Sequence, residues 1–299
     1  MSVQAAYLGI ILIWSTTPLA IQWSTQGTGF ALAVFARMAI GVVVAALLVL
    51  VWRIRFPLHA RARRAYLVGG LGLFGAMALT YWGARYVHSG LISVLFGLSP
   101  LMAAVLAAVF LGERGLTPLK VGGMLLGAGG LATIFINGGS LASEHALAGL
   151  AALLAAVFVY SGSLVWLKRI GDDSPPLATT VGTLTVSLPL FGLVWWLSDG
   201  RLPAMVPLRS GAAIVYLGVF GSVIGFALYY YVIKHLETSK VALITLVTPV
   251  IALLLGHWLN GEEIGLRLWL GTGLSLLGPS VHQWEMLAGL YRPALRAAD

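Results

Sequence analysis

Long apolar segments alternate with short polar ones along the whole chain. Ten segments of about 20 predominantly apolar residues recur, and a helix of that length crosses the hydrocarbon core of a bilayer. The pattern predicts an all-α, polytopic membrane protein with ten transmembrane helices. These spans are expected near residues 3–23, 30–52, 66–84, 91–111, 120–136, 147–167, 177–197, 210–231, 240–259 and 268–287.

Composition supports this interpretation. Apolar residues make up 59% of the chain and charged residues 9%, whereas charged residues are roughly 25% of a typical soluble domain. The first apolar run, Val3 to Trp23, has no basic residue before Arg37 and no small-residue cleavage pattern, so we interpret it as a span and not a signal peptide. The absence of cysteine excludes disulfides and cysteine-bound metals.

The basic residues gather on one side of the predicted membrane. With a cytoplasmic N-terminus, thirteen Lys and Arg fall on the inner side and four on the outer side. This positive-inside bias predicts a bacterial-type inner-membrane protein with both termini in the cytoplasm, and it explains the net charge of +8 without a nucleic-acid partner. The inner residues are Arg53, Arg55, Arg61, Arg63, Arg64, Arg114, Lys120, Lys168, Arg169, Lys234, Lys240, Arg292 and Arg296, and the outer ones Arg85, Arg201, Arg209 and Arg267.

The chain contains an internal repeat. At a constant offset of 149 positions, Tyr81 matches Tyr230, Pro100 matches Pro249, and the Gly-Glu pair ending in Glu113 matches the one ending in Glu262. We therefore predict two repeats, residues 1–145 with spans 1–5 and residues 146–299 with spans 6–10. Five spans is an odd number, so the second repeat must be inverted relative to the first, as in secondary transporters that work by alternating access.

The repeated segments also resemble a known family. "SPLMAAVLAAVFLGERGLTPLKVGGMLLGAGG" and "TPVIALLLGHWLNGEEIGLRLWLGTGLSLLG" are similar to the EamA repeat of the drug/metabolite transporter superfamily, and the whole chain resembles its aromatic amino acid exporter branch. The resemblance implies a ten-helix inner-membrane exporter with a central cavity lined mainly by spans 1, 3, 4, 6, 8 and 9. It implies a small-molecule substrate and no cofactor or metal.

The matched prolines mark positions where helices are expected to bend or break. Pro100 and Pro249 each remove a backbone hydrogen bond near the membrane midplane, and Ser99 and Thr248 could bond the freed groups. Static kinks that only shape packing are the alternative. With these residues open to a cavity, the backbone near them would meet the carboxylate and ammonium of a zwitterion.

Aromatic residues are the second candidate for the cavity wall. Trp14 and Tyr160 match across the repeat in "WS" and "YS", which adds Ser15 and Ser161, and their depth does not suit an interfacial belt. They could line a cavity for a flat apolar substrate or serve packing. Tyr81 and Tyr230 could belong to interfacial belts or act as opposite gates.

Arg37 is the one clearly embedded charge. It could bind a substrate carboxylate, or it could extend toward the interface and cap carbonyls. Glu113 and Glu262 are expected to anchor helix ends near Lys and Arg. Since the remaining acidic residues also fall in connections, tails or span ends, we predict a carrier without proton coupling. His257 is the residue most able to overturn that prediction.

Other classes fit the sequence less well. An enzyme would need embedded acid–base or nucleophilic groups within mutual reach, and the chain has no H-E-x-x-H, G-x-S-x-G or paired intramembrane Asp. A channel remains open as an alternative, although Pro-interrupted helices around an aromatic cavity suit occlusion better. We predict export of aromatic and other neutral amino acids, with cationic drugs or other metabolites as the alternative. Glycine pairs could mediate contacts within a monomer, which is slightly favoured, or in a dimer.

Overall fold

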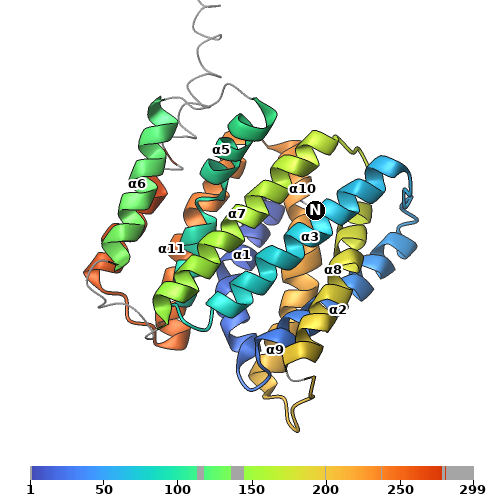
Figure 1. Cartoon of the computed structure of the whole chain (residues 1–299), viewed down its shortest axis with the longest axis horizontal. Coiled ribbons are helices and arrows are strands. Elements are labelled where there is room, and N and C mark those ends of the chain that lie inside the picture. Colours follow the sequence, from blue (N-terminus) through green and yellow to red (C-terminus); the bar gives the residue numbers. More distant parts are fainter. Residues whose placement is uncertain are drawn as a thin grey trace, which may run out of the picture.

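The computed structural model of the chain describes residues 2–112, 118–135, 145–198, 200–236, 238–277 and 280. Within these residues the regular structure is entirely helical (Figure 1). The helices are α1 (Val3–Thr25), α2 (Phe30–Val51), α3 (Ala60–Gly83), α4 (Ser89–Phe96), α5 (Ser99–Leu111), α6 (Pro118–Phe135), α7 (Ala146–Ile170), α8 (Pro176–Ser198), α9 (Leu208–Tyr216), the π-helix η1 (Leu217–Ile224), α10 (Gly225–His235) and α11 (Thr238–Asn260). A further apolar helix covers Leu266–Leu277.

The observed helices confirm the predicted architecture. Seven of the described helical segments are long and apolar enough to cross a membrane, and α4 with α5 forms one of them, Ser89–Leu111. Another, Leu208–Tyr229, combines α9, η1 and most of α10. The remaining predicted spans overlap α6, α11 and Leu266–Leu277. Residues 281–287 of the last predicted span lie outside the described residues. The protein is a polytopic all-α membrane protein, because lipid requires each spanning segment to satisfy its own backbone.

Local side chains and glycines define several helix ends. The Ser2 hydroxyl accepts a hydrogen bond from the backbone N–H of Ala5 at 3.2 Å, and so caps α1. At the other end of helices, Gly112, Gly171 and Gly261 adopt φ values of 65°, 60° and 65°, directly after α5, α7 and α11. A residue without a Cβ takes this left-handed conformation at low cost, so these glycines stop the helices.

The helices form one bundle in which α1 is central. It packs against α4, α9, η1, α10 and α11, whereas α3 packs against α7 and α8, and α2 packs against α8 and η1 (Figure 1). Small residues allow the closest approaches. A Cβ at Gly72 would lie 2.2 Å from Cβ of Ser163, between α3 and α7, and one at Gly90 would lie 2.7 Å from Cα of Leu253, between α4 and α11. Close glycine contacts are typical of membrane helices.

The two matched prolines behave differently. Pro100 lies in the first turn of α5, after the helix breaks at Gly97 and Leu98, and a first-turn proline loses no helical hydrogen bond. Pro249 lies inside α11, which continues from Thr238 to Asn260. The bend or break expected at both positions is therefore a break between two helices only at Pro100. Before the break in the chain, α4 packs on α1 and α11. After the break, α5 packs on α7 and α6.

Candidate functional site

The side chain of Arg37 is buried in the helix bundle. Only 5% of Arg37 is exposed, and its Nε donates to the Ser222 hydroxyl at 3.0 Å. Its Nη1 donates to the hydroxyl of fully buried Tyr81 at 3.4 Å. Within the part of the chain that the structure describes, no carboxylate lies within ion-pair distance of it. The guanidinium therefore bonds neutral hydroxyls and does not extend to the interface, which leaves a buried cation that an anionic ligand would stabilise.

The π-helix η1 places the partners of Arg37. A Cβ at Gly221 would lie 3.4 Å from Nη2 of Arg37 and 3.8 Å from the Thr17 hydroxyl, so α1 and α2 both approach the helix at this glycine. At Gly225 a Cβ would lie 3.4 Å from Nε1 of Trp14. Wide turns of this kind occur frequently at functional sites. From the sequence, glycine pairs were expected only to mediate helix contacts. Ser222 was not predicted, because a π-helix has no periodic signal in the sequence.

Trp14 and Ser15 are adjacent residues on α1. The Trp14 ring contacts that of Tyr229 on α10, with centroids 4.9 Å apart and planes tilted by 42°. The Ser15 hydroxyl is fully buried and has no hydrogen-bond partner among the described residues. A buried hydroxyl without a partner is uncommon and offers a bond to a ligand. We call the group of Trp14, Thr17, Arg37, Tyr81 and Ser222 the arginine cluster.

A second group surrounds the break between α4 and α5. The Ser161 hydroxyl donates to the backbone carbonyl of Ser99 at 3.2 Å, and the Ser99 hydroxyl donates to the Phe96 carbonyl. The Tyr160 and Phe96 rings lie with centroids 5.9 Å apart. Ser99 and Ser161 thus bond backbone oxygens at the break, as the sequence predicted for Ser99. Helix α7 supplies Tyr160 and Ser161 together, which keeps the proline-interrupted span against α7.

The remaining predicted site residues lie outside these groups. Thr248 is 5% exposed and precedes Pro249 within the continuous helix α11. Tyr230 lies on α10, and its side chain lies outside the described residues. The pairing of Tyr81 and Tyr230 as opposite gates therefore stays a prediction. The matched Glu113 also lies outside the described residues.

Glu262 lies in a buried hydrogen-bond network where α1, α4 and α11 meet, which we call the Glu262 end. Its Oε2 accepts from the backbone N–H of Ser89 at 3.0 Å and its Oε1 from Nδ2 of Asn260 at 2.9 Å. The Asn260 amide also donates to the Gln22 side chain at 3.2 Å and accepts from Nε1 of Trp23 at 3.1 Å.

Glu262 therefore anchors a helix end, but its partners differ from those expected. From the sequence, Lys or Arg was expected beside it. Instead it caps the N-terminus of α4, where the helix dipole favours an anion, and no Lys or Arg in the described chain forms an ion pair with it. Gln22, Ser89 and Asn260 were not predicted from the sequence. Their signal was polar amides and a hydroxyl at the edges of apolar segments, which by itself is common in membrane helices.

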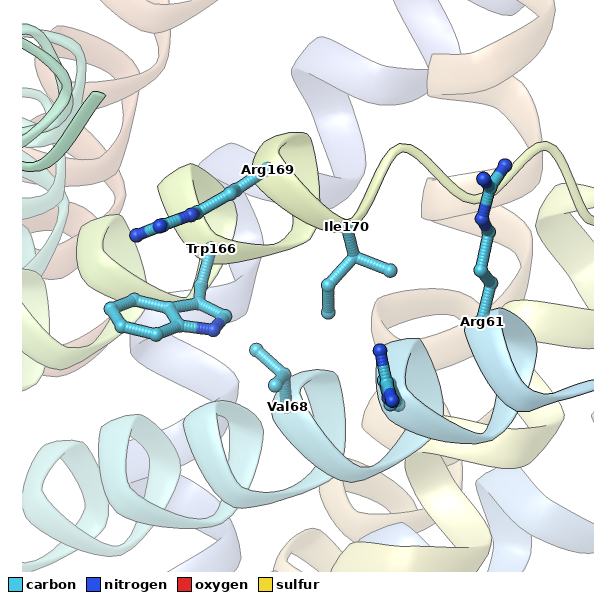
Figure 2. Close-up of a pocket in the computed structure, with 6 residues that line it drawn as sticks. Arg61, Val68, Trp166, Arg169 and Ile170 are labelled. Carbon is cyan, nitrogen blue, oxygen red and sulfur yellow. The ribbon is translucent and has the colours of Figure 1, made fainter. Parts of the chain in front are cut away.

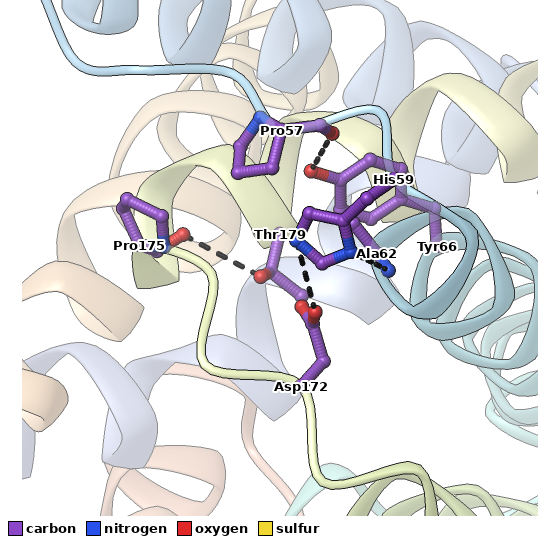
Figure 3. Close-up of polar contacts among 7 residues, drawn as sticks. All are labelled: Pro57, His59, Ala62, Tyr66, Asp172, Pro175 and Thr179. Carbon is purple, nitrogen blue, oxygen red and sulfur yellow. Dashed lines mark hydrogen bonds and ion pairs between the residues drawn. The ribbon is translucent and has the colours of Figure 1, made fainter.

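A second buried carboxylate, Asp172, lies in the α7–α8 connection, next to the N-terminal end of α3 (Figure 3). We call this the His59 end. His59 precedes α3, its Nδ1 accepts from the backbone N–H of Ala62 at 3.2 Å, and its Nε2 lies 3.8 Å from Oδ1 of Asp172. The hydroxyl of Tyr66 donates to the Pro57 carbonyl at 2.8 Å and holds the preceding loop. These contacts connect the α2–α3 loop to the α7–α8 connection.

The same end contains a set of metal-ligand types that the sequence analysis did not predict. His59, Asp172 and Asp173 each offer an atom, and these atoms lie within 4.8 Å of one another. His59 and Asp173 are exposed. The Nδ1 cap orients the His59 ring, and the His59–Asp172 contact orients the Asp172 carboxylate, without a metal. We interpret the group as a contact that holds the α2–α3 loop against the α7–α8 connection. The prediction of no metal and no cofactor remains a prediction.

Comparison with known sequences identifies the family. The EamA-like transporter family model matches residues 3–136 and again residues 147–281. The chain belongs to this family. An "Uncharacterized transporter" of Archaeoglobus fulgidus is 30% identical over 71% of this chain and 75% of its own length. Family membership makes the protein a transporter and not an enzyme.

Further relatives cover more of the chain. A "Probable terminal-alkyne amino-acid exporter" of Streptantibioticus cattleyicolor is 29% identical over 90% of this chain and 89% of its own. The "Uncharacterized inner membrane transporter YedA" of Escherichia coli K12 is 26% identical over 90% and 86%. A solved crystal structure matches with a TM-score of 0.63 and 23% identity, over 94% of this chain and 96% of its own. That likeness shows the shared fold.

Proposed function

We propose that this transporter exports small amphipathic metabolites that carry a carboxylate, with aromatic and other neutral amino acids as its main substrates. The observation that carries the proposal is the arginine cluster. Its buried guanidinium has no acidic partner in the described chain, and it packs at Gly221, one turn before Gly225, where Trp14 of the Trp14–Tyr229 ring pair packs. A carboxylate would pair with the guanidinium, and an aromatic side chain would stack against the rings. One relative, the amino-acid exporter of Streptantibioticus cattleyicolor, is named for a substrate of this class.

Cationic drugs are the alternative substrate class. A cation entering this site would meet the positive charge of Arg37, and the described chain has no mid-membrane carboxylate to offset that repulsion. The charge of the cluster therefore favours anionic or zwitterionic substrates over cations.

We propose further that residues 1–145 and 146–299 are inverted repeats that exchange conformations during transport. Packing supports this, because exchanging the two repeats converts observed helix pairs into other observed pairs. The α3–α7 pair converts into α10–α1, and the pairs α2–α8 and α4–α11 convert into themselves. Two equivalent halves of opposite orientation can open one site to either side in turn.

The packing also departs from this symmetry at the Glu262 end. Helix α1 packs against α4 at the Glu262 end, whereas the equivalent pair, α7 and α11, makes no comparable contact in the described residues. We propose that the Glu262 end, predicted to face the outside, is closed in this conformation. Export then requires the Gln22–Asn260–Glu262 network to separate while the equivalent contact forms at the other end.

Substitution of Arg37 tests the substrate proposal. In proteoliposomes, Arg37→Gln should lower counterflow of labelled phenylalanine by about tenfold or more, since a hydrogen bond to a charged group contributes about 1.5–3 kcal/mol. The counterflow rate of Arg37→Lys should lie between those of wild type and Arg37→Gln, because an ammonium keeps the charge but not the bidentate geometry. Phenethylamine, which lacks the carboxylate, provides the matched control.

Two outcomes would contradict the proposal. If Arg37→Gln reduces phenylalanine and phenethylamine counterflow equally while the protein stays monodisperse, Arg37 has only a structural role. If phenethylamine is transported well and phenylalanine is not, the cationic-drug alternative is correct.

A further inference from the structure

A recess lined by three arginines lies between α3 and α7, away from the arginine cluster (Figure 2). Arg61 and Arg64 come from the first turns of α3, and Arg169 comes from the last turn of α7. The recess has a volume of about 340 Å³ and is completed by Val68, Trp166 and Ile170. Its lining therefore combines positive charge at the helix ends with apolar side chains one turn deeper.

Among the described residues, the three arginines have no acidic partner that would neutralise them. No described carboxylate lies within ion-pair distance of any of the three. Arg169 lies over the Trp166 ring, with its guanidinium carbon 5.6 Å from the ring centroid. The guanidinium groups place positive charge on both sides of the recess, with Arg61 and Arg169 pointing away from each other (Figure 2). An anionic group in the recess would be attracted by all three, and these long side chains can turn toward it to donate hydrogen bonds.

Apolar surface continues from the recess along the bundle. Leu71, at a helical spacing from Arg64 and Val68, is 55% exposed. The Trp166 ring, 45% exposed, lies 6.3 Å from the ring of Phe110, which is 52% exposed on α5. In a membrane protein this surface faces acyl chains. A free anion would use the arginines alone, whereas a phospholipid would use the arginines and this apolar surface together.

We propose that the recess formed by Arg61, Arg64, Arg169 and Trp166 is a binding site for the headgroup of an anionic phospholipid. The phosphate lies in the recess, where the arginine side chains turn toward it, the indole lies at the level of the glycerol, and the acyl chains run along Leu71 and Phe110. Basic pockets between membrane helices on the cytoplasmic side bind such headgroups, and the charge distribution predicts that this end is cytoplasmic. The bound lipid would connect α3 of the first repeat to α7 of the second.

Native mass spectrometry of the purified full chain tests the site. Protein released from micelles with equimolar phosphatidylglycerol and phosphatidylcholine should retain phosphatidylglycerol, and the triple variant Arg61→Gln, Arg64→Gln, Arg169→Gln should lose it. Each substitution should weaken retention by about fivefold. Arg55→Gln is the matched control, because Arg55 is an exposed arginine in the α2–α3 loop that does not line the recess.

Each outcome decides the proposal. Retention in wild type and Arg55→Gln, with loss in the triple variant, supports it. Equal loss in Arg55→Gln would show general attraction to the basic end and overturn it. Displacement of the lipid by inorganic phosphate, or equal retention of phosphatidylcholine, would also overturn it, the first by showing a free-anion site and the second by showing an apolar groove. A melting temperature of the triple variant close to wild type excludes misfolding as the cause, and the single variants serve if it does not fold.

Discussion

Glu262 and Asp172 are both buried carboxylates at helix ends, but their surroundings differ. Both oxygens of Glu262 accept hydrogen bonds, one from the backbone of α4 and one from Asn260. Oδ1 of Asp172 is buried without a hydrogen bond, and the basic group within 4.0 Å of it among the described residues is the imidazole of His59, 3.8 Å away. A carboxylate that bonds a helix N-terminus and an amide fixes the helices around it, whereas one beside a half-exposed histidine holds its neighbours weakly.

This difference indicates which end of the bundle is held closed. At the Glu262 end, side chains from α1 and α11 and the residues that follow α11 join the start of α4 in one network. At the His59 end, loop residues meet through one long contact (Figure 3). If the bundle alternates between two states, the Glu262 network must be broken in the other state, and its substitution should have the largest effect.

Removal of the Glu262 side chain should produce the largest change. Glu262→Ala leaves the Ser89 N–H and an Asn260 N–H buried without an acceptor, which should cost about 1–3 kcal/mol in the free energy of unfolding. Glu262→Gln keeps one acceptor oxygen and should cost less. Thermal unfolding in detergent measures both, and a closed end that depends on this network should also become more accessible.

Accessibility can be measured cleanly because the chain has no cysteine. Ser93, 9% exposed on α4 and one turn beyond Ser89, provides the position for a single reporter, Ser93→Cys. In intact cells its reaction with an impermeant maleimide should be slow, and should become several-fold faster when combined with Glu262→Ala. Unchanged labelling in the double variant would show that the network does not close this end.

Asp172→Asn should change stability much less. The substitution removes a buried charge whose Oδ1 has no donor, and the contact it loses involves a His59 side chain that is 51% exposed. We expect a change in the free energy of unfolding below about 1 kcal/mol, typical of an exposed ion pair. Asp173→Asn, at the exposed neighbouring position, is the control. Destabilisation by Asp172→Asn equal to that of Glu262→Gln would remove the distinction between the two ends.

The spans could be predicted from the sequence because lipid imposes a local requirement. A segment in the hydrocarbon core must be apolar and must satisfy its own backbone, so about 20 apolar residues predict a helix without knowledge of its neighbours. The break before Pro100 was also predictable from local sequence, because a proline fits the first turn of a helix better than its interior. Pro249 shows the limit of this rule, because α11 accommodates the same residue without dividing.

The sites depended on tertiary contacts and were only partly predictable. Arg37 was identified because a charge inside an apolar segment is conspicuous, but its partner Ser222 comes from a π-helix 185 residues away in the chain. Glu262 was identified by the repeat, whereas its bond to the α4 amide depends on how α4 meets the end of α11. Composition and periodicity report which faces are buried. They do not report which polar groups meet there.

The smallest expected effect is that of a pH gradient on transport. Proton coupling would require a titratable group at the substrate site, and the carboxylates of the described chain, Asp172, Asp173, Glu262 and Glu263, all lie outside the helices. His257, the main risk to this prediction, lies exposed in the last turn of α11, where its Nδ1 is 2.8 Å from the Glu262 carbonyl.

We therefore predict an uncoupled carrier. At equal internal and external phenylalanine, proteoliposomes should show the same exchange rate with and without an imposed pH gradient, and net flux should reverse when the phenylalanine gradient is reversed. His257→Ala should leave both results unchanged, because its ring bonds a backbone oxygen at the end of the bundle and is remote in sequence and fold from the arginine cluster. Uphill accumulation driven by the pH gradient alone, and abolished by His257→Ala, would make the Glu262 end a coupling site and not merely a closed end.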